Sequence, residues 1–361
     1  MSGSVKKLIV GVDYGTTFSG VSYVFSDASN VSDVEILDSW GAGDQYQRQV
    51  PSRISYDPRY TWGYDIGNRE LAYCWTKLLL DDHAIETQHD DGNLRKYYGA
   101  GFKTTPKGKT ATNVVADYLK FLYSHMMREL GRKLSEEILA VTPIQFWFTL
   151  PALWSHRAQN ATLQAATRAG FGSRHNDEIH LVKEPEAAAI ACLSGLTAKG
   201  PSPHVQAGKI VLVCDCGGGT VDLASYEITS ERPKLSLKEV CVSEAGKCGS
   251  TTIDRAFYQL MRKRFGGVFE KVPEEKRGVT SKFMKDFEAA KKDFGVSDHP
   301  RNTRLNLKMQ AKASEHYDDD DNEVILTGFD MKQLFDPVVQ QVLGLLQKQI
   351  KATEKAGRTV N

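Results

Sequence analysis

The chain has 361 residues, of which 41% are hydrophobic and 25% are charged. These values are ordinary for folded proteins, and the length exceeds what one hydrophobic core usually supports, so we expect two domains or one two-lobed unit. The net charge of +1, from 46 Lys and Arg against 45 Asp and Glu, excludes a strong overall field for nucleic acid or an anionic membrane. Any anion site must therefore be local.

Six cysteines are too few for a disulfide framework, and none forms a CxxC pair. No apolar run reaches the length of a signal peptide or a membrane span, so we expect a cytoplasmic protein, with the nucleus as the alternative. Cys214 and Cys216 would point to one face of a strand. Without a second pair or a His cluster, we expect structural thiols here rather than metal ligands.

An internal repeat is the most informative feature of the sequence. Residues 8–25 read LIVGVDYGTTFSGVSYVF, and residues 209–228 read KIVLVCDCGGGTVDLASYEI. Each is a β-branched run that ends at Asp13 or Asp215, followed by a tight Gly/Thr turn and a second alternating run, which predicts a hairpin. Two similar hairpins far apart in the chain predict two related lobes.

Between and after the hairpins, strand patterns alternate with helix patterns, which is typical of an α/β fold. The expected strands cover residues 144–150 and 179–182, and the expected helices cover 111–130, 151–170, 185–193, 253–265, 281–293 and a final helix from near Pro337 to Lys351.

Pro and Gly residues interrupt this pattern at residues 197–208, which we expect to connect the two lobes. Lobe I would then cover residues 1–196 and lobe II residues 209–361, with a helical subdomain at about 246–321. The acidic run at 318–321 is expected to be a solvated loop, because calcium loops need spaced ligands and a Gly.

The turns after Asp13 and Asp215 predict phosphate binding. The N–H groups of a Gly- and Thr-rich turn can converge on a phosphate, which a Cβ would obstruct, and Thr hydroxyls can add hydrogen bonds. A carboxylate cannot face a phosphate without repulsion, so the two Asp residues imply Mg²⁺ between them. One such hairpin alone would be ordinary, but the pair predicts a nucleotide cleft.

Several ordered motifs resemble one known family, the DnaK-type 70-kDa heat-shock chaperones. Residues 11–19 and 213–222 resemble the family's phosphate motifs, residues 181–190 its connecting segment, and residues 245–254 and 287–292 its adenosine-side segments. The aromatic residues around Trp62 and Trp75 look closest to the divergent twelfth group, as found in fungi. The resemblance implies an α/β, two-lobed actin-like ATPase (ribonuclease H-like) fold with ATP or ADP and Mg²⁺ in a cleft between the lobes. It also implies possible protein clients or co-chaperones.

The resemblance further implies roles for individual residues. Asp13, Glu184 and Asp215 would surround the attacking water and the metal, which Asp13 and Asp215 would hold through water. Lys77 would face the γ-phosphate, with a solvated surface lysine as the alternative. Lys292 stands where the family usually has a stacking Arg, so weaker adenine binding is expected. Phosphate contacts are implied for Gly15, Thr16, Thr17, Gly217, Gly218, Gly219 and Thr220, and adenosine contacts for Gly249, Ser250, Glu288, Lys291 and Lys292.

The family's nucleotide domain continues past its final helix into a strand and a Gly-Gly-Ser turn over the adenine, and nothing in the sequence resembles that turn. We therefore expect an incomplete nucleotide-binding domain with uncovered apolar surface in lobe II, and an ATPase that is slow or inactive. The alternatives are a nucleotide-sensing scaffold that closes without turnover and a sugar-kinase-like phosphotransferase.

Two weaker patterns point elsewhere. Gly108-Lys109-Thr110 resembles the end of a P-loop, but the first Gly and a preceding strand are missing. His83 and His89 stand among acidic residues without fixed spacing, which favours surface charge over a metal site.

Overall fold

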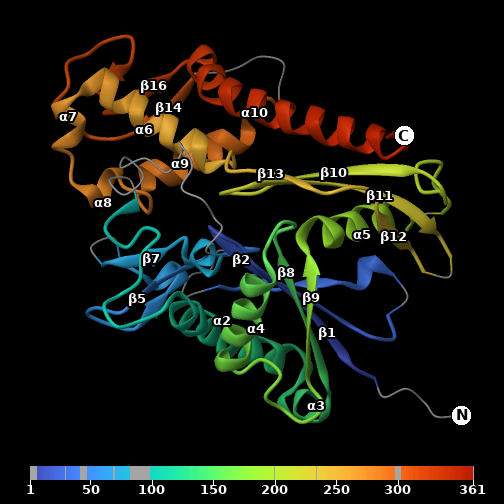
Figure 1. Cartoon of the computed structure of the whole chain (residues 1–361). Helices are drawn as coiled ribbons and strands as arrows, with labels where there is room; N and C mark the ends of the chain where they lie inside the picture. The colour runs from blue at the N-terminus through green and yellow to red at the C-terminus, as the bar shows by residue number, and fades with distance from the viewer. Residues whose placement is uncertain are drawn as a thin grey trace, which may run out of the picture.

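A computed structural model describes residues 6–28, 30–40, 47–67, 70–81, 98–198, 200–232, 234–296 and 302–360. Two groups of elements are visible in Figure 1: strands and helices from the N-terminal half lie below, and those from the C-terminal half lie above. Each group contains a central sheet, as the repeated hairpins predict.

The lower group is built on a six-stranded sheet in the order β3-β2-β1-β8-β9, with β4 also paired to β2. β1 is antiparallel to β2 and parallel to β8, which is parallel to β9. The strands are β1 (Leu8–Tyr14), β2 (Phe18–Phe25), β3 (Glu35–Ile36), β4 (Val50–Pro51), β8 (Ile144–Leu150) and β9 (Glu178–Lys183).

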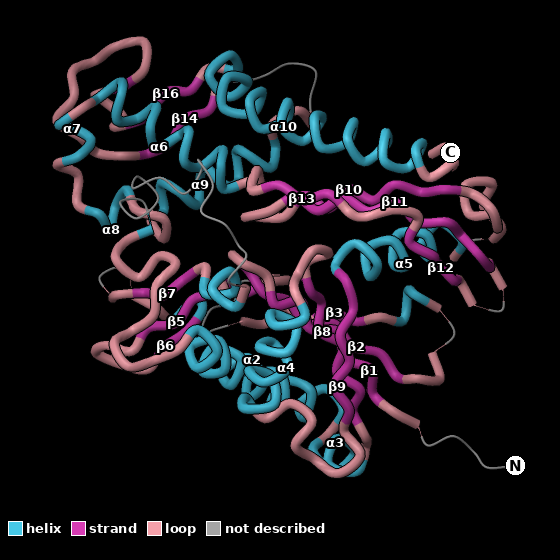
Figure 2. The backbone as a smooth tube through the Cα atoms, viewed as in Figure 1, coloured by secondary structure: helices cyan, strands magenta, loops and turns pink. Residues whose placement is uncertain are grey.

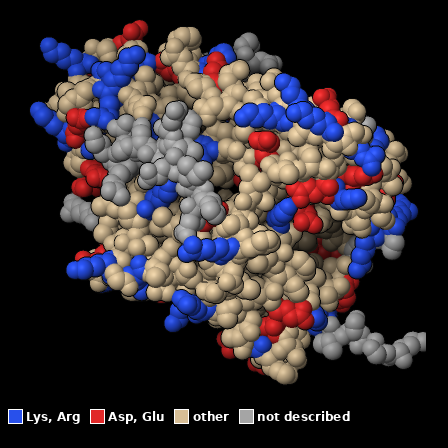
Figure 3. Space-filling view, viewed as in Figure 1, with Lys and Arg blue, Asp and Glu red and all other residues tan. Residues whose placement is uncertain are grey.

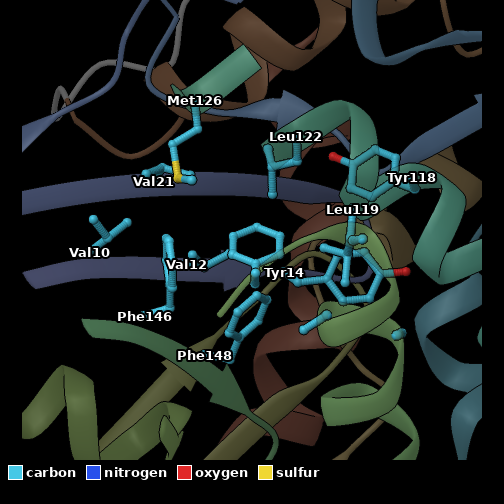
Figure 4. Close-up of a cluster of buried hydrophobic side chains, with 14 of the residues drawn as sticks. Val10, Val12, Tyr14, Val21, Tyr118, Leu119, Leu122, Met126, Phe146 and Phe148 are labelled. Atoms are coloured by element: carbon cyan, nitrogen blue, oxygen red, sulfur yellow. The ribbon is translucent and has the colours of Figure 1, made fainter. Parts of the chain in front are cut away.

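Helices α2 (Ala111–Leu134) and α4 (His156–Ala169) pack side by side, and α2 supplies much of the core against this sheet. Alternate residues of β1 are buried, as the alternation of side chains along a strand requires, and they meet the apolar face of α2. Figure 4 shows Val10 and Val12 beneath Leu122 and Met126. This core holds the end of β1, and therefore Asp13, in a fixed position.

Smaller elements complete the lower group. A three-stranded sheet in the order β6-β5-β7 lies at its edge, beside the short helix that carries Lys77. The elements are β5 (Arg53–Ser55), β6 (Thr61–Trp62), β7 (Ala72–Cys74), α3 (Glu136–Val141) and the 3-10 helices η1 (Val31–Asp33), η2 (Gly63–Asp65) and η3 (Thr76–Leu80).

The upper group contains a four-stranded sheet in the order β10-β11-β12, with β13 also paired to β11. Helix α5 (Glu184–Thr197) packs on one face and α10 (Gly328–Lys355) on the other, as Figures 1 and 2 show. Among the described strands, β10 pairs only with β11, so it is an edge strand of this sheet. The strands are β10 (Ile210–Cys216), β11 (Val221–Ser230), β12 (Ser236–Glu239) and β13 (Glu244–Gly246).

The segment expected to be helical also holds a three-stranded sheet in the order β14-β16-β15. Strands of two to four residues are too short for a periodic pattern, so the sequence did not predict them. The elements are α6 (Thr251–Phe265), α7 (Gly267–Glu270), α8 (Glu274–Arg277), α9 (Lys282–Asp293), β14 (Thr303–Asn306), β15 (Tyr317–Asp318) and β16 (Glu323–Leu326).

Two predicted helix starts are wrong. The final helix begins at Gly328, nine residues before Pro337, because Thr327 and Asp330 form a capping box there, and Pro337 lies inside the helix. The helix expected from residue 151 begins at His156, where the Ser155 hydroxyl caps the Ala158 amide. Both predictions placed the start of the helix at a proline, whereas a capping side chain marks the start in each case.

Candidate functional site

The two hairpin turns have the tight geometry that the sequence predicts. In the first, a Cβ on Gly15 would lie 2.1 Å from the Phe18 carbonyl oxygen, so only glycine fits. In the second, the Gly217 amide donates to the Thr220 carbonyl at 2.9 Å and closes a four-residue turn between β10 and β11. Each turn therefore holds the backbone in a compact bend directly after an Asp.

The two turns lie against one another, although one belongs to each group of elements. A Cβ on Gly218 would lie 2.1 Å from Thr17 Oγ1, and a Cβ on Gly219 would lie 3.2 Å from Thr16 Cγ2. These glycines permit a close approach that any side chain would prevent. The predicted phosphate-holding residues are thus brought together.

Within the described residues, backbone amides without a protein acceptor meet at this contact. In the described ranges, the amides of Thr16, Thr17, Gly218 and Gly219 donate to no protein acceptor. Amide groups that meet without acceptors form a ready site for an anion, because each N–H can donate to an oxygen of the ligand. This arrangement suits a phosphate chain.

Four carboxylates gather beside the turns. Asp13 accepts a hydrogen bond from the Thr149 hydroxyl at 2.8 Å. Burial raises the pKa of Asp215, and the nearby charges of Glu184 and Asp13 raise it further, while Lys77 lowers it. The carboxylates of Asp13 and Asp215 are therefore close enough to repel each other, which is the spatial relationship expected from the repeat.

Asp222 is the fourth carboxylate and has no role in the sequence prediction. It pairs across the strands with Asp215 and is only 3% exposed. Burial raises its pKa to about 6, with a further contribution from Glu184. The signal was present in the sequence, since an Asp two residues after the Gly/Thr turn must share the end of the hairpin with Asp215.

Lys77 is the ammonium that faces this cluster. Its side chain is 3% exposed, and its Nζ lies 2.5 Å from Glu184 Oε1. The alternative of a solvated surface lysine is therefore wrong. Glu184 is the first residue of α5, immediately after β9, so the parallel strand order places it at the same edge of the sheet as Asp13.

The local charge fits a hard divalent cation. Four carboxylates and one ammonium lie near the turns. Burial raises the pKa values of Asp215 and Asp222, and the charges of neighbouring carboxylates raise them further. Mg²⁺ prefers carboxylate and water oxygens and keeps several waters, so Asp13 and Asp215 suit binding through water. The donor set contains only oxygen ligands, as this ion requires.

The predicted adenosine-side loop supports the second turn directly. The amides of Ser250 and Thr251 donate to the carbonyls of Gly217 and Gly218, both at 3.0 Å, and the Gly249 amide donates to Gly219 at 3.3 Å. The amides of Gly249 and Ser250 are thus already used. These two residues hold the shape of the turn and cannot donate their amides to a ligand in this arrangement.

The predicted adenosine residues of α9 differ in exposure. Lys291 is 7% exposed and binds Asp254 Oδ1 at 2.7 Å and Glu288 Oε2 at 2.5 Å. Lys292 is far more exposed and lies 3.5 Å from Glu288. Asp254, in the first turn of α6, therefore connects the glycine turn to α9, a link that the sequence prediction missed.

Three weaker sequence patterns were the P-loop-like segment at residues 108–110, the acidic run at 318–321, and the histidines His83 and His89. Lys109 pairs with Asp117 at 2.7 Å, and Thr110 caps α2, so the P-loop reading is wrong. In the described part of the chain, residues 318–320 form the one group of three or more His, Cys, Asp or Glu side chains whose ligand atoms lie within 4.8 Å of one another, but Asp318 is paired with Arg304. His83 and His89 lie outside the described residues.

Within the described residues, charge on the visible face and the two cavities can be compared with the turns. Figure 3 shows Lys and Arg interspersed with Asp and Glu over the visible face, as the net charge predicts. Two cavities, of about 340 and 360 Å³, lie away from the turns: one beside Trp40 and Trp62, the other between α5 and β10.

Among the helices described, none is long and apolar enough to cross a membrane.

Paired hairpins with acidic strand ends, on two sheets that meet at their turns, define the actin-like ATPase class. The sequence profile described as "Hsp70 protein" matches residues 96–360, so the chain belongs to the Hsp70 family. The predicted family and fold are thus confirmed.

Individual relatives agree with this assignment. The chain is 28% identical to human heat shock 70 kDa protein 12B over 321 residues, which cover 73% of the chain and 46% of the relative. It is 25% identical to human heat shock 70 kDa protein 12A, over 86% of the chain and 53% of the relative. It is 24% identical to chaperone protein DnaK of Mycoplasmopsis pulmonis, over 81% of the chain and 41% of the relative. The chain spans about half the length of these relatives.

Proposed function

We propose that the chain binds ATP or ADP with Mg²⁺ between the two hairpin turns and hydrolyses ATP slowly. The contact of Gly218 with Thr17, with free amides on both sides, supports this proposal most. Homology to the Hsp70 nucleotide-binding domain supports it independently.

In this proposal, the residues of the two turns bind and orient the phosphates. Bound Mg²⁺ would neutralise phosphate charge, which is the main requirement of phosphoryl transfer. Asp13 and Asp215 would hold the ion through water, and Lys77 would supply positive charge for the γ-phosphate. Glu184 would orient the attacking water, which requires its close ion pair with Lys77 to open when ATP is bound.

We also propose a division into lobe I (1–196), a connection (197–208) and lobe II (209–361), with a subdomain at about 246–321. The separate cores support it, since one cluster of buried residues falls within 8–171 and another within 253–338. Nucleotide bound between the turns would draw the lobes together. Clients or co-chaperones would bind the closed and open arrangements with different affinity. Exposed apolar side chains on α10 could contact them: Val339, Leu343 and Ile350.

A nucleotide-sensing scaffold is the second candidate function. One observation favours it: the carboxylate of Glu184, the candidate for orienting water, already accepts a hydrogen bond from buried Lys77 in a close ion pair. If this pair persists when ATP is bound, water is not activated and closure occurs without turnover. The family assignment favours both candidates over a sugar-kinase-like transferase.

Phosphate release from ATP by the purified chain tests the first proposal. We expect slow, Mg²⁺-dependent release that is lost in Asp215→Asn, whereas Lys282→Ala, which changes an exposed lysine at the start of α9, serves as the matched control for catalysis. Equal release by Asp215→Asn would defeat the hydrolysis proposal. ATP binding with no release in the parent chain would select the scaffold.

A further inference from the structure

Cys214 and Cys216 form a close thiol pair on β10, and their Sγ atoms are 3.6 Å apart. They are separated by one residue in a strand, so both side chains leave the same face. The sequence indicated this orientation but not the approach of the two sulfurs. The two sulfur atoms are therefore in direct contact.

The distance fits a shared tetrahedral ion. Two thiolates that bind one Zn²⁺-like ion at about 2.3 Å each lie roughly 3.8 Å apart when the angle at the ion is tetrahedral. The observed 3.6 Å requires almost no movement of either side chain. A disulfide would require the two side chains to move further, because its sulfurs lie only about 2 Å apart.

The pair is accessible from solvent. Cys216 is exposed, and Cys214 is half-buried. An ion and its coordinated waters can therefore reach the two sulfurs.

A third thiol lies nearby but does not complete the site. Cys248 is buried in the same small apolar cluster that Cys214 packs against. No group of three ligand atoms within 4.8 Å of one another in the described ranges includes it. The protein thus supplies two ligands and leaves the remaining positions of a tetrahedral ion to water.

We propose that Cys214 and Cys216 form a dithiolate binding site for a soft divalent cation of tetrahedral preference, of the Zn²⁺ and Cd²⁺ class. Each thiol loses its proton to solvent when it binds, so one ion displaces two protons. The site is independent of the proposed nucleotide function. Cys214 packs toward α10, whereas Asp215, between the two cysteines, points to the other face of the strand and interacts with Glu184 of α5.

Titration of the reduced, metal-free full chain with Cd²⁺ tests this site, with thiolate-to-metal charge-transfer absorbance as the readout. Oxygen ligands give no such band, so an ion in the carboxylate cluster does not contribute. We expect one Cd²⁺ per chain with release of two protons, and competition by Zn²⁺. Losing one thiolate converts a chelate into a single contact, so Cys214→Ser and Cys216→Ser should each bind roughly 100-fold more weakly.

Cys192→Ser is the matched control, because Cys192 is an exposed single thiol on α5. It should leave the titration unchanged. Cys216 is itself exposed, so its serine variant should fold, and circular dichroism checks this. Unchanged affinity in Cys216→Ser, absence of the band in the parent chain, or loss of both thiols to a disulfide before metal is added would each overturn the proposal.

Discussion

Lys77 Nζ lies 2.5 Å from Glu184 Oε1, and 107 residues separate the two in the chain. The pair connects the short helix η3 to the first residue of α5, and the side chains of Lys77 and Glu184 are 3% and 16% exposed. Removing one member of such a pair leaves the other charge buried without compensation.

Lys77→Met should therefore lower the free energy of unfolding by about 3 kcal/mol. Glu184→Gln in the same chain should recover part of this loss, because the uncompensated carboxylate is gone. Lys292→Ala, whose lysine is exposed, should change stability by less than about 0.5 kcal/mol. Denaturant unfolding measures all three variants. A Lys77→Met chain as stable as the parent would show that the pair contributes nothing.

Gly218→Ala should weaken ATP binding without unfolding the chain. The new methyl would lie 2.1 Å from Thr17 Oγ1, so the two turns must separate. Thr17→Ala in the same chain removes the nearest atom and should restore part of the binding. Gly344→Ala is the matched control, because a Cβ there meets nothing within 4 Å. Calorimetric titration with ATP compares them, and full affinity in Gly218→Ala would argue against a shared site at these turns.

Asp222 should make stability depend on pH in buffer without divalent cations. Its pKa is raised from 3.8 to about 6 by burial, so between these values the folded chain binds more protons than the unfolded chain. The free energy of unfolding should therefore fall as the pH rises through this window, by about 3 kcal/mol at most for this group. Asp222→Asn should flatten the dependence, and Mg²⁺ should oppose the fall. An equally steep profile in Asp222→Asn would contradict the assignment.

Pro337→Ala should stabilise the chain by about 2 kcal/mol, because the exposed proline removes a hydrogen bond to the carbonyl of Gln333 inside α10. The loss of proline's constraint on the unfolded chain reduces the gain. Thermal unfolding measures the change. A lower melting temperature in Pro337→Ala would show that proline's constraint on the unfolded chain outweighs the missing hydrogen bond.

The parts of the site that depend on local sequence were predictable. A β-branched run, an Asp and a Gly/Thr turn specify a hairpin by themselves, so Asp13 and Asp215 lie at their expected strand ends. The contacts that join distant segments were not predictable in the same way. The pairing of Lys291 with Asp254 depends on how α6 and α9 pack, and neither helix pattern specifies its neighbour.

The errors in the fold also have physical causes. The start of α10 was placed near Pro337 because proline favours the first turn of a helix, yet the Thr327 cap lies ten residues earlier and proline was accommodated at an exposed position. Residues 303–326 form a sheet of very short strands, whose stability comes from packing on Phe257 and Leu334 rather than from a local pattern.

Calorimetric titration of the purified chain with ATP, with and without Mg²⁺, tests the central claim most directly. If Asp13 and Asp215 flank a metal-bridged phosphate chain, ATP should bind the parent protein in a 1:1 ratio with Mg²⁺ and far more weakly without it. In Asp215→Asn, which removes one of the repelling carboxylates, the dependence on Mg²⁺ should be much smaller. Absence of ATP binding under both conditions, or equal binding with and without Mg²⁺ in the parent chain, would contradict the account.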